Sequence, residues 1–166
     1  MLSEKKVIEI IKKRSQMQTN VRKKIIGIYK EMETAEVESI ETVTFHSSLG
    51  KLNICGNQST DLLKVLERQK ATERNYNQEL QIRLEELQGE LYMIQRVWTC
   101  YQSLPVAEYE ILFELYEKDK PWKAVEAEMK INHKTLVRKR KNAIERILKW
   151  SCSTMTNAEI IQEKEM

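Results

Sequence analysis

Apolar side chains recur at alternating spacings of three and four residues in the first part of the chain, over residues 3–33. This spacing is typical of a helix that buries one heptad seam. Ser3, followed by an acidic residue, is a suitable N-cap for such a helix. The middle of the seam is polar, and its positions are Val7, Ile11, Arg14, Gln18, Val21, Ile25, Ile28 and Met32.

A second and longer heptad pattern covers residues 59–103. Ser59, Thr60 and Asp61 offer N-caps. The pattern begins at Leu63 and Leu66, is interrupted by Lys70, Glu73 and Asn77, and then continues through Leu80, Leu84, Leu87, Leu91, Ile94, Trp98 and Tyr101.

Both helices therefore carry a polar layer within an apolar seam, and such layers fix the register of paired helices. An antiparallel pairing that sets Val7 near Leu87 also sets Gln18 opposite Asn77 and Arg14 within a turn of Glu73. The sequence thus predicts a long antiparallel helical hairpin that resembles a coiled coil. A homodimeric coiled coil through the same seam is the alternative.

Residues 34–58 break the heptad period between the two helices. Acidic residues come first, Val43 to Phe45 is a short β-like run, and Gly50 and Gly56 mark turns. We interpret the segment as an irregular connection, in which a small hairpin with residues 51–55 or an absence of fixed structure both remain open.

Residues 104–150 predict a compact helical unit of three short helices. Leu104 and Pro105 open the first helix, which has Pro near its first turn. The tail, residues 151–166, is polar and acidic and predicts a flexible end. The apolar positions assigned to the core of this unit are Val106, Tyr109, Leu112, Phe113, Tyr116, Trp122, Val125, Met129, Leu136, Ala143 and Ile147.

The composition agrees with an all-α fold and narrows the functional classes. Two Pro, four Gly and 7% aromatic residues argue against an all-β fold, and 32% charged residues suit helices with wide solvent faces. No apolar run approaches the length of a membrane span, and the chain opens without a signal-peptide pattern. The three cysteines are widely spaced and odd in number, which favours a reducing cytoplasm.

The chemistry-bearing motifs of enzymes are missing from the sequence. It has no Gly-rich phosphate loop, no paired cysteines with zinc spacing and no HExxH. Neither His46 nor His133 has a neighbouring nucleophile that would complete a catalytic set. We therefore expect a non-enzymatic protein without a metal or cofactor.

Positive charge is concentrated in one segment of the chain. Residues 118–149 hold eleven Lys or Arg against four Asp or Glu, a net charge of +7, whereas the whole chain is +3. The remainder therefore sums to −4. Clustered cations on a helical unit are the electrostatic signature of a protein that binds the phosphate backbone, although most charge runs are solvated surface.

The same segment has the spacing of a helix–turn–helix, in which the second helix enters the major groove. Asn132 is the expected N-cap of that helix. Arg138 and Lys141 can reach guanine edges, Val137 a thymine methyl, and Lys134 a phosphate; Lys139 and Arg140 are off this stripe and face flanking phosphates. The DNA-contacting set predicted from the sequence is Lys123, His133, Lys134, Thr135, Val137, Arg138 and Lys141.

The run from Leu104 to Leu148 resembles the promoter-reading C-terminal helix–turn–helix of bacterial sigma factors. The shared features are the Leu104-Pro105 opening, Tyr116 at the end of the first helix, the turn at residues 129–132, Thr135-Leu136 and Ala143-Ile144. This detailed motif covers about 45 residues. The wider arrangement, with an N-terminal helix, an irregular middle, a long heptad helix and then this unit, covers nearly the whole chain and is similar to the ArpU/RinA group of phage-encoded transcriptional regulators.

This resemblance implies a sequence-specific DNA-binding regulator, an activator of phage or prophage genes, that works on duplex DNA in the bacterial cytoplasm at the nucleoid. The resemblance leaves open whether the protein also binds RNA polymerase and whether it forms a homodimer. Two positions depart from the pattern: Glu126 stands where a small residue is expected, and Lys130 where Gly or Asn is expected. Ala127 would have to replace Glu126 at the helix contact, and Lys130 would have to adopt a backbone conformation that glycine accepts more readily.

The rival functional class is an interaction protein. In that interpretation a coiled-coil adaptor binds RNA polymerase or another acidic protein partner through its basic C-terminal part and does not read DNA directly.

Overall fold

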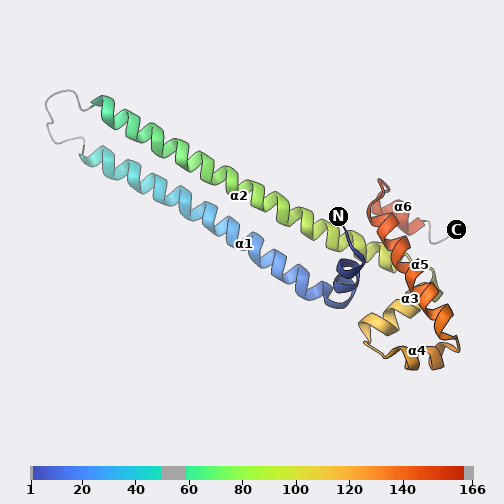
Figure 1. Cartoon of the computed structure of the whole chain (residues 1–166). Coiled ribbons are helices and arrows are strands. Elements are labelled where there is room, and N and C mark those ends of the chain that lie inside the picture. The colour runs from blue at the N-terminus through green and yellow to red at the C-terminus, as the bar shows by residue number, and fades with distance from the viewer. Residues whose placement is uncertain (1, 50–58, 163–166) are drawn as a thin grey trace. The chain divides into compact units, whose positions relative to one another are not determined.

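The computed structural model describes residues 2–49 and 59–162, and over these ranges it contains helices and no strand (Figure 1). The predicted all-α fold class is therefore confirmed. Over the same ranges, no helix combines the length and the apolar character that a membrane span requires. The elements are α1 (Glu4–Leu49), α2 (Ser59–Gln102), α3 (Val106–Leu112), the π-helical η1 (Phe113–Glu117), α4 (Trp122–Met129), α5 (His133–Ser151) and α6 (Asn157–Gln162).

Helix α1 is longer than the sequence pattern indicated, since it ends at Leu49. The prediction of an irregular connection over 34–58 is wrong for residues 34–49, and the β-like run Val43 to Phe45 is helical. No Gly or Pro lies between Gly27 and Gly50 to end the helix, and the intrinsic strand preference of a few β-branched residues is weak without a sheet. Residues 50–58, including the remaining strand candidate, lie outside the described residues.

A bend divides α1 near its start. Lys13 has φ −126° and ψ 22°, which leaves the helical region of backbone space. We call the short helical segment before this bend, Glu4 to Lys12, the N-terminal arm. The arm buries the face that carries Val7, Ile10 and Ile11, which are 0%, 1% and 3% exposed.

The chain forms two compact units, and each contains parts of both long helices. The second unit is Val21–Gly89 and consists of the later part of α1 and the earlier part of α2. Its buried apolar residues include Val21, Ile28 and Leu80, which belong to the predicted seams. A hairpin closed by residues 50–58 stays a prediction, because that connection is outside the described residues.

The predicted register of the two long helices is wrong. Arg14 stacks on the ring of Trp98, with its guanidinium carbon 4.4 Å from the ring centroid, and both residues belong to the first unit. Trp98 lies about seven helical turns further along α2 than Glu73, the predicted neighbour of Arg14. A heptad seam keeps its apolar pattern when one helix slides by several turns, so a polar layer alone could not fix the register. The side-chain oxygen of Asn77 is buried without a hydrogen-bond partner.

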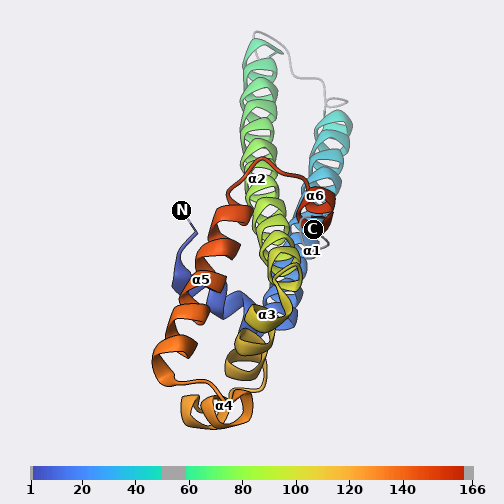
Figure 2. The same ribbon diagram turned by 90° about the vertical axis from the view of Figure 1, so that its right-hand side faces the viewer.

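The first unit comprises Met1–Asn20 and Glu90–Met166, and so holds the arm, the end of α2 and all later helices. Helices α3, η1, α4 and α5 share a core of Ile111, Leu115, Val125 and Leu136, against which Tyr116, Met129 and Ile131 pack. Two positions assigned to this core are exposed instead, Val106 at 65% and Trp122 at 37%. Figure 2 shows how α3, α4 and α5 follow one another after α2.

The α-helical pattern also missed one core residue, which lies in a π-helical turn. In η1 the Lys118 N–H donates to the carbonyl of Phe113 across five residues, so side chains after it are rotated relative to an α-helical stripe. Leu115, which the α-helical pattern did not select, is only 5% exposed. A row of aromatic side chains runs from α2 into α3 and η1. The ring centroids of Tyr101 and Tyr109 are 4.9 Å apart, and those of the stacked rings of Tyr109 and Phe113 are 5.9 Å apart.

The segment after α5 is docked up to Gln162, so the prediction of a flexible tail is wrong for residues 151–162. Helix α6 buries Ile160 completely. Its N-terminus is closed by a reciprocal capping box: the Thr156 N–H donates to the Glu159 carboxylate at 2.6 Å, and the Glu159 N–H donates to Thr156 Oγ1 at 3.3 Å. The backbone and hydroxyl of Thr156 lower the pKa of the Glu159 carboxyl.

Arg96 of α2 holds this C-terminal segment in place. Its side chain is 3% exposed, and its guanidinium donates to the carbonyls of Trp150, Ser151, Ser153 and Met155 at 2.7–3.0 Å. The last carbonyls of a helix have no partner within the helix, so a cation at this place satisfies the end of α5 and also favours its dipole.

Candidate nucleic-acid interface

The connection between α4 and α5 is a tight three-residue turn. Lys130 ends α4 in the left-handed conformation, with φ 52° and ψ 41°, as the sequence led us to expect for a lysine in a glycine position. Asn132 then caps α5, because its side-chain oxygen accepts from the Thr135 N–H at 2.8 Å. The predicted N-cap of the second helix is therefore confirmed.

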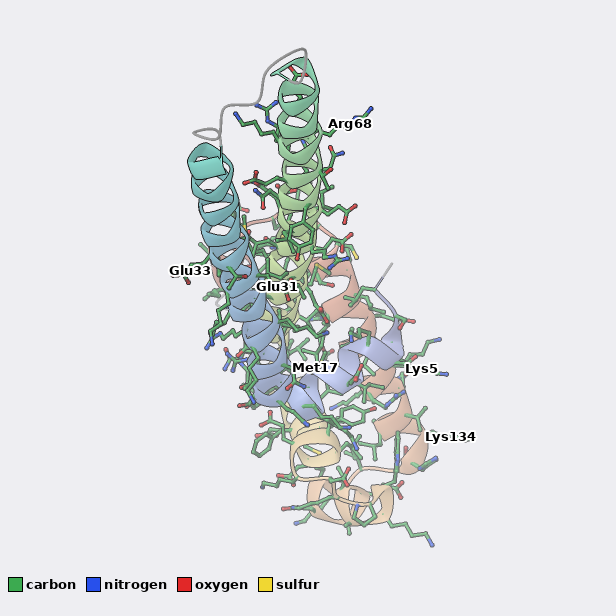
Figure 3. All side chains as sticks on the ribbon, turned by 90° about the vertical axis from the view of Figure 1, so that its left-hand side faces the viewer. Lys5, Met17, Glu31, Glu33, Arg68 and Lys134 are labelled. Atoms are coloured by element: carbon green, nitrogen blue, oxygen red, sulfur yellow. The ribbon has the colours of Figure 1, made fainter. Side chains whose placement is uncertain are left out.

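Helix α5 has one apolar face, and the sequence identified it correctly. Leu136, Ala143 and Ile147 are all 0% exposed. Lys134, Arg138 and Lys141 follow the i, i+4, i+7 spacing of a second stripe and are exposed. Figure 3 shows the Lys134 side chain extending into solvent near the start of α5. The helix therefore presents a stripe of cations on the side away from its core.

The other predicted contact residues lie around this stripe. His133 is exposed in the first turn of α5, and Val137 is 39% exposed on the flank. Thr135 is half-buried, and its backbone N–H is used by the Asn132 cap. Lys123 is exposed on α4, two positions before the buried Val125.

Other cations of the basic segment are held by acidic partners, and this could not be foreseen from charge counts. Lys120 contacts Glu114 at 2.6 Å and Glu128 at 2.5 Å, and Lys118 contacts Glu114 at 2.7 Å. Lys118 and Lys120 lower the pKa of the Glu114 carboxyl, and Glu114 and Glu128 raise the pKa of Lys120. These lysines are part of a local ion-pair network.

Arg140 also turns inward, so the expectation that it grips a flanking phosphate is wrong. Its Nε–H donates to the Tyr116 hydroxyl at 2.5 Å, and its Nη2 lies 2.6 Å from a carboxylate oxygen of Glu4. Its guanidinium also lies 5.9 Å from the ring centroid of Trp122. Burial acts to lower the pKa of Arg140, but the hydrogen bonds to Tyr116 and Glu4 outweigh it and the pKa is raised.

Glu126, the acidic residue that departs from the sigma-factor pattern, finds a partner on the other side of the turn. Glu126 stays in a half-buried position, and its carboxylate lies 2.6 Å from Nδ1 of His133. The His133 ring in turn lies 5.8 Å from the ring of Trp122. Ala127 is exposed, so the expectation that it replaces Glu126 at the helix contact is wrong; the buried residue of α4 is Val125.

The cations on and around the stripe differ from those of the network in having few acidic neighbours. Among the residues that the structure describes, Lys123, Lys134, Arg138 and Lys139 have no ion-pair partner. Lys141 approaches Glu145 at 3.7 Å, with both side chains exposed, which is a weak interaction in water. The charge of these residues is therefore available to a partner.

The described residues contain no group of three or more His, Cys, Asp or Glu that could hold a metal ion. Cys100 is buried, which raises the pKa of its thiol to about 11, so it is a poor nucleophile at neutral pH. Cys152 is exposed and unpaired.

Comparison of the chain with protein-family models, with curated proteins and with solved structures gave no match.

Proposed function

We propose that this protein binds duplex DNA through the exposed stripe of α5 and acts as a sequence-specific transcriptional regulator. The observation that carries the proposal is the division of α5 into an apolar face and an opposite face where Lys134, Arg138 and Lys141 are exposed. Helices α4 and α5, joined by the turn at Lys130, correspond to a helix–turn–helix whose second helix reads the major groove.

The chemistry of the stripe fits both parts of DNA recognition. Arg138 is one turn into α5, and an arginine at that position can donate two hydrogen bonds to the O6 and N7 atoms of guanine. Lys134 in the first turn and Lys123 on α4 suit the phosphates at the rim of the groove. Val137, exposed beside Arg138, can contact a thymine methyl group.

The first test compares charge-matched variants for binding to a duplex selected from a random pool. We expect Arg138→Ala to weaken specific binding by roughly 1–3 kcal/mol and to relax base preference at one position. We expect Lys134→Ala to weaken binding to all sequences alike and to reduce the salt dependence by about one counterion.

Arg83→Ala and Lys30→Ala are matched controls for these two variants. Each removes the same charge from an exposed position of the second unit, so each accounts for the loss of net charge alone. Circular dichroism verifies that the variants are folded, and Leu136→Asp gives the signature of an unfolded first unit because it buries a charge.

Parent-like binding of folded Arg138→Ala and Lys134→Ala at low salt contradicts the proposal. The interpretation as a coiled-coil adaptor that binds RNA polymerase or another acidic protein would then take its place.

A further inference from the structure

The N-terminal arm packs in the same unit as α5, although the two are at opposite ends of the sequence. The Glu4 carboxylate accepts from the Arg140 guanidinium at 2.6 Å, and Lys12 contacts Asp119 at 2.6 Å. Lys12 also lies 5.8 Å from the ring centroid of Tyr116. The fully buried Val7 fixes the inner face of the arm, so both ends and the middle of the arm are anchored.

These anchors determine which charges the arm presents outward. Lys6 is paired with Glu9 at 3.3 Å, and Lys12 is paired with Asp119. Glu4 is neutralised by Arg140. Lys5 is exposed, and no described residue forms an ion pair with it. The arm therefore offers one available cation at its start.

Lys5 is also on the correct side of the unit to act together with α5. Figure 3 shows Lys5 and Lys134 extending into solvent on the same side. Lys5 directly follows Glu4, which is bonded to Arg140, and Arg140 is about 9 Å along the helix axis from Lys134 at 1.5 Å per residue. The major groove is about 12 Å wide and is lined on both rims by phosphates.

We propose that Lys5 contacts a DNA phosphate beside the base pairs that α5 reads, so that the N-terminal arm is a second part of the DNA-binding surface. The inference rests on the proposed function of α5. The Glu4–Arg140 ion pair has two effects here: it fixes the arm against α5, and it cancels an acidic charge that would repel the phosphate. A phosphate contact adds affinity without sequence preference.

The experiment measures the affinity of full-length variants for a selected duplex and for a random duplex over a range of salt concentrations. Lys5→Ala should weaken binding to both duplexes by the same factor, roughly five- to ten-fold in 0.1 M salt, and make the log–log salt slope shallower by about 0.9. Lys5→Glu should weaken binding further, and Lys5→Arg should retain it. Lys30→Ala in the second unit is the matched control and should retain the salt slope of the parent.

The set of outcomes separates this inference from the proposed function. If Lys5→Ala and Lys5→Glu bind like the parent while Lys134→Ala and Arg138→Ala are weakened, the arm has no role and α5 alone binds DNA. If all four variants bind like the parent, the proposed function is wrong and the inference is wrong with it. A change in affinity without a change in salt slope also contradicts a phosphate contact, because losing such a contact must reduce counterion release.

Discussion

At the scale of single residues, the turn before α5 was the most predictable part of the molecule. Asn132 is a residue type that commonly caps helices, and the resemblance to the sigma-factor turn implied an unusual backbone conformation at Lys130. The partners of Glu126 and Arg140 were not predictable. Glu126 meets His133 across a turn, and Arg140 meets a carboxylate 136 residues away, and no local pattern encodes such contacts.

Lys130 gives a stability prediction at this scale. A left-handed conformation costs an L-residue about 1–2 kcal/mol, and glycine avoids most of that cost but loses roughly 0.5–1 kcal/mol more backbone entropy on folding. Lys130→Gly should therefore raise the free energy of unfolding by about 0.5–1 kcal/mol, measured by chemical denaturation. Lys130→Ala is the control, because it removes the same side-chain charge and keeps the Cβ atom. An equal gain in both variants would show that charge, and not backbone conformation, sets the effect.

At the scale of elements, periodicity predicted faces well and ends poorly. The buried face of α5 and the buried seam residues Val21, Ile28 and Leu80 were predicted from spacing, because local spacing decides which face of a helix is apolar. The continuation of α1 to Leu49 and the presence of α6 were missed. Acidic, polar stretches resemble loops in composition, although Thr156 and Glu159 form a capping box that was visible in the sequence.

Arg96 gives the prediction for this scale, since one side chain of α2 holds α6 and the end of α5. Arg96→Ala leaves several buried carbonyls without a donor, and we expect it to lower the free energy of unfolding by at least about 2–3 kcal/mol. It should also open the segment before α6 to proteases. Arg83→Ala, an exposed arginine of the same helix, should change stability by less than about 0.5 kcal/mol. Resistance of the Arg96→Ala variant to proteolysis at residues 152–156 would contradict the role of Arg96 in holding this segment.

At the scale of the whole molecule, the first unit is built from segments that are far apart in the sequence, Met1–Asn20 and Glu90–Met166. The arm joins α5 through Glu4 and Arg140, and the end of α2 joins α6 through Arg96. Composition and periodicity divide the chain into consecutive ranges of residues. They carry no information about contacts between segments that are far apart in the sequence. The basic segment was recognised correctly as an unusual feature, but only the packed structure separates its paired cations from its available ones.

The measurement that tests the central claim most directly is the salt dependence of duplex DNA binding by the unmodified full-length protein. If Lys123, Lys134, Arg138 and Lys141 meet phosphates or displace counterions from the groove, the plot of log affinity against log salt should have a slope of about −3 to −4. The additional contact of Lys5 would steepen the slope by about 0.9, to about −4.5. Absence of binding at 50 mM salt, or an affinity that does not change with salt, would contradict the account of α5 as a DNA-binding helix.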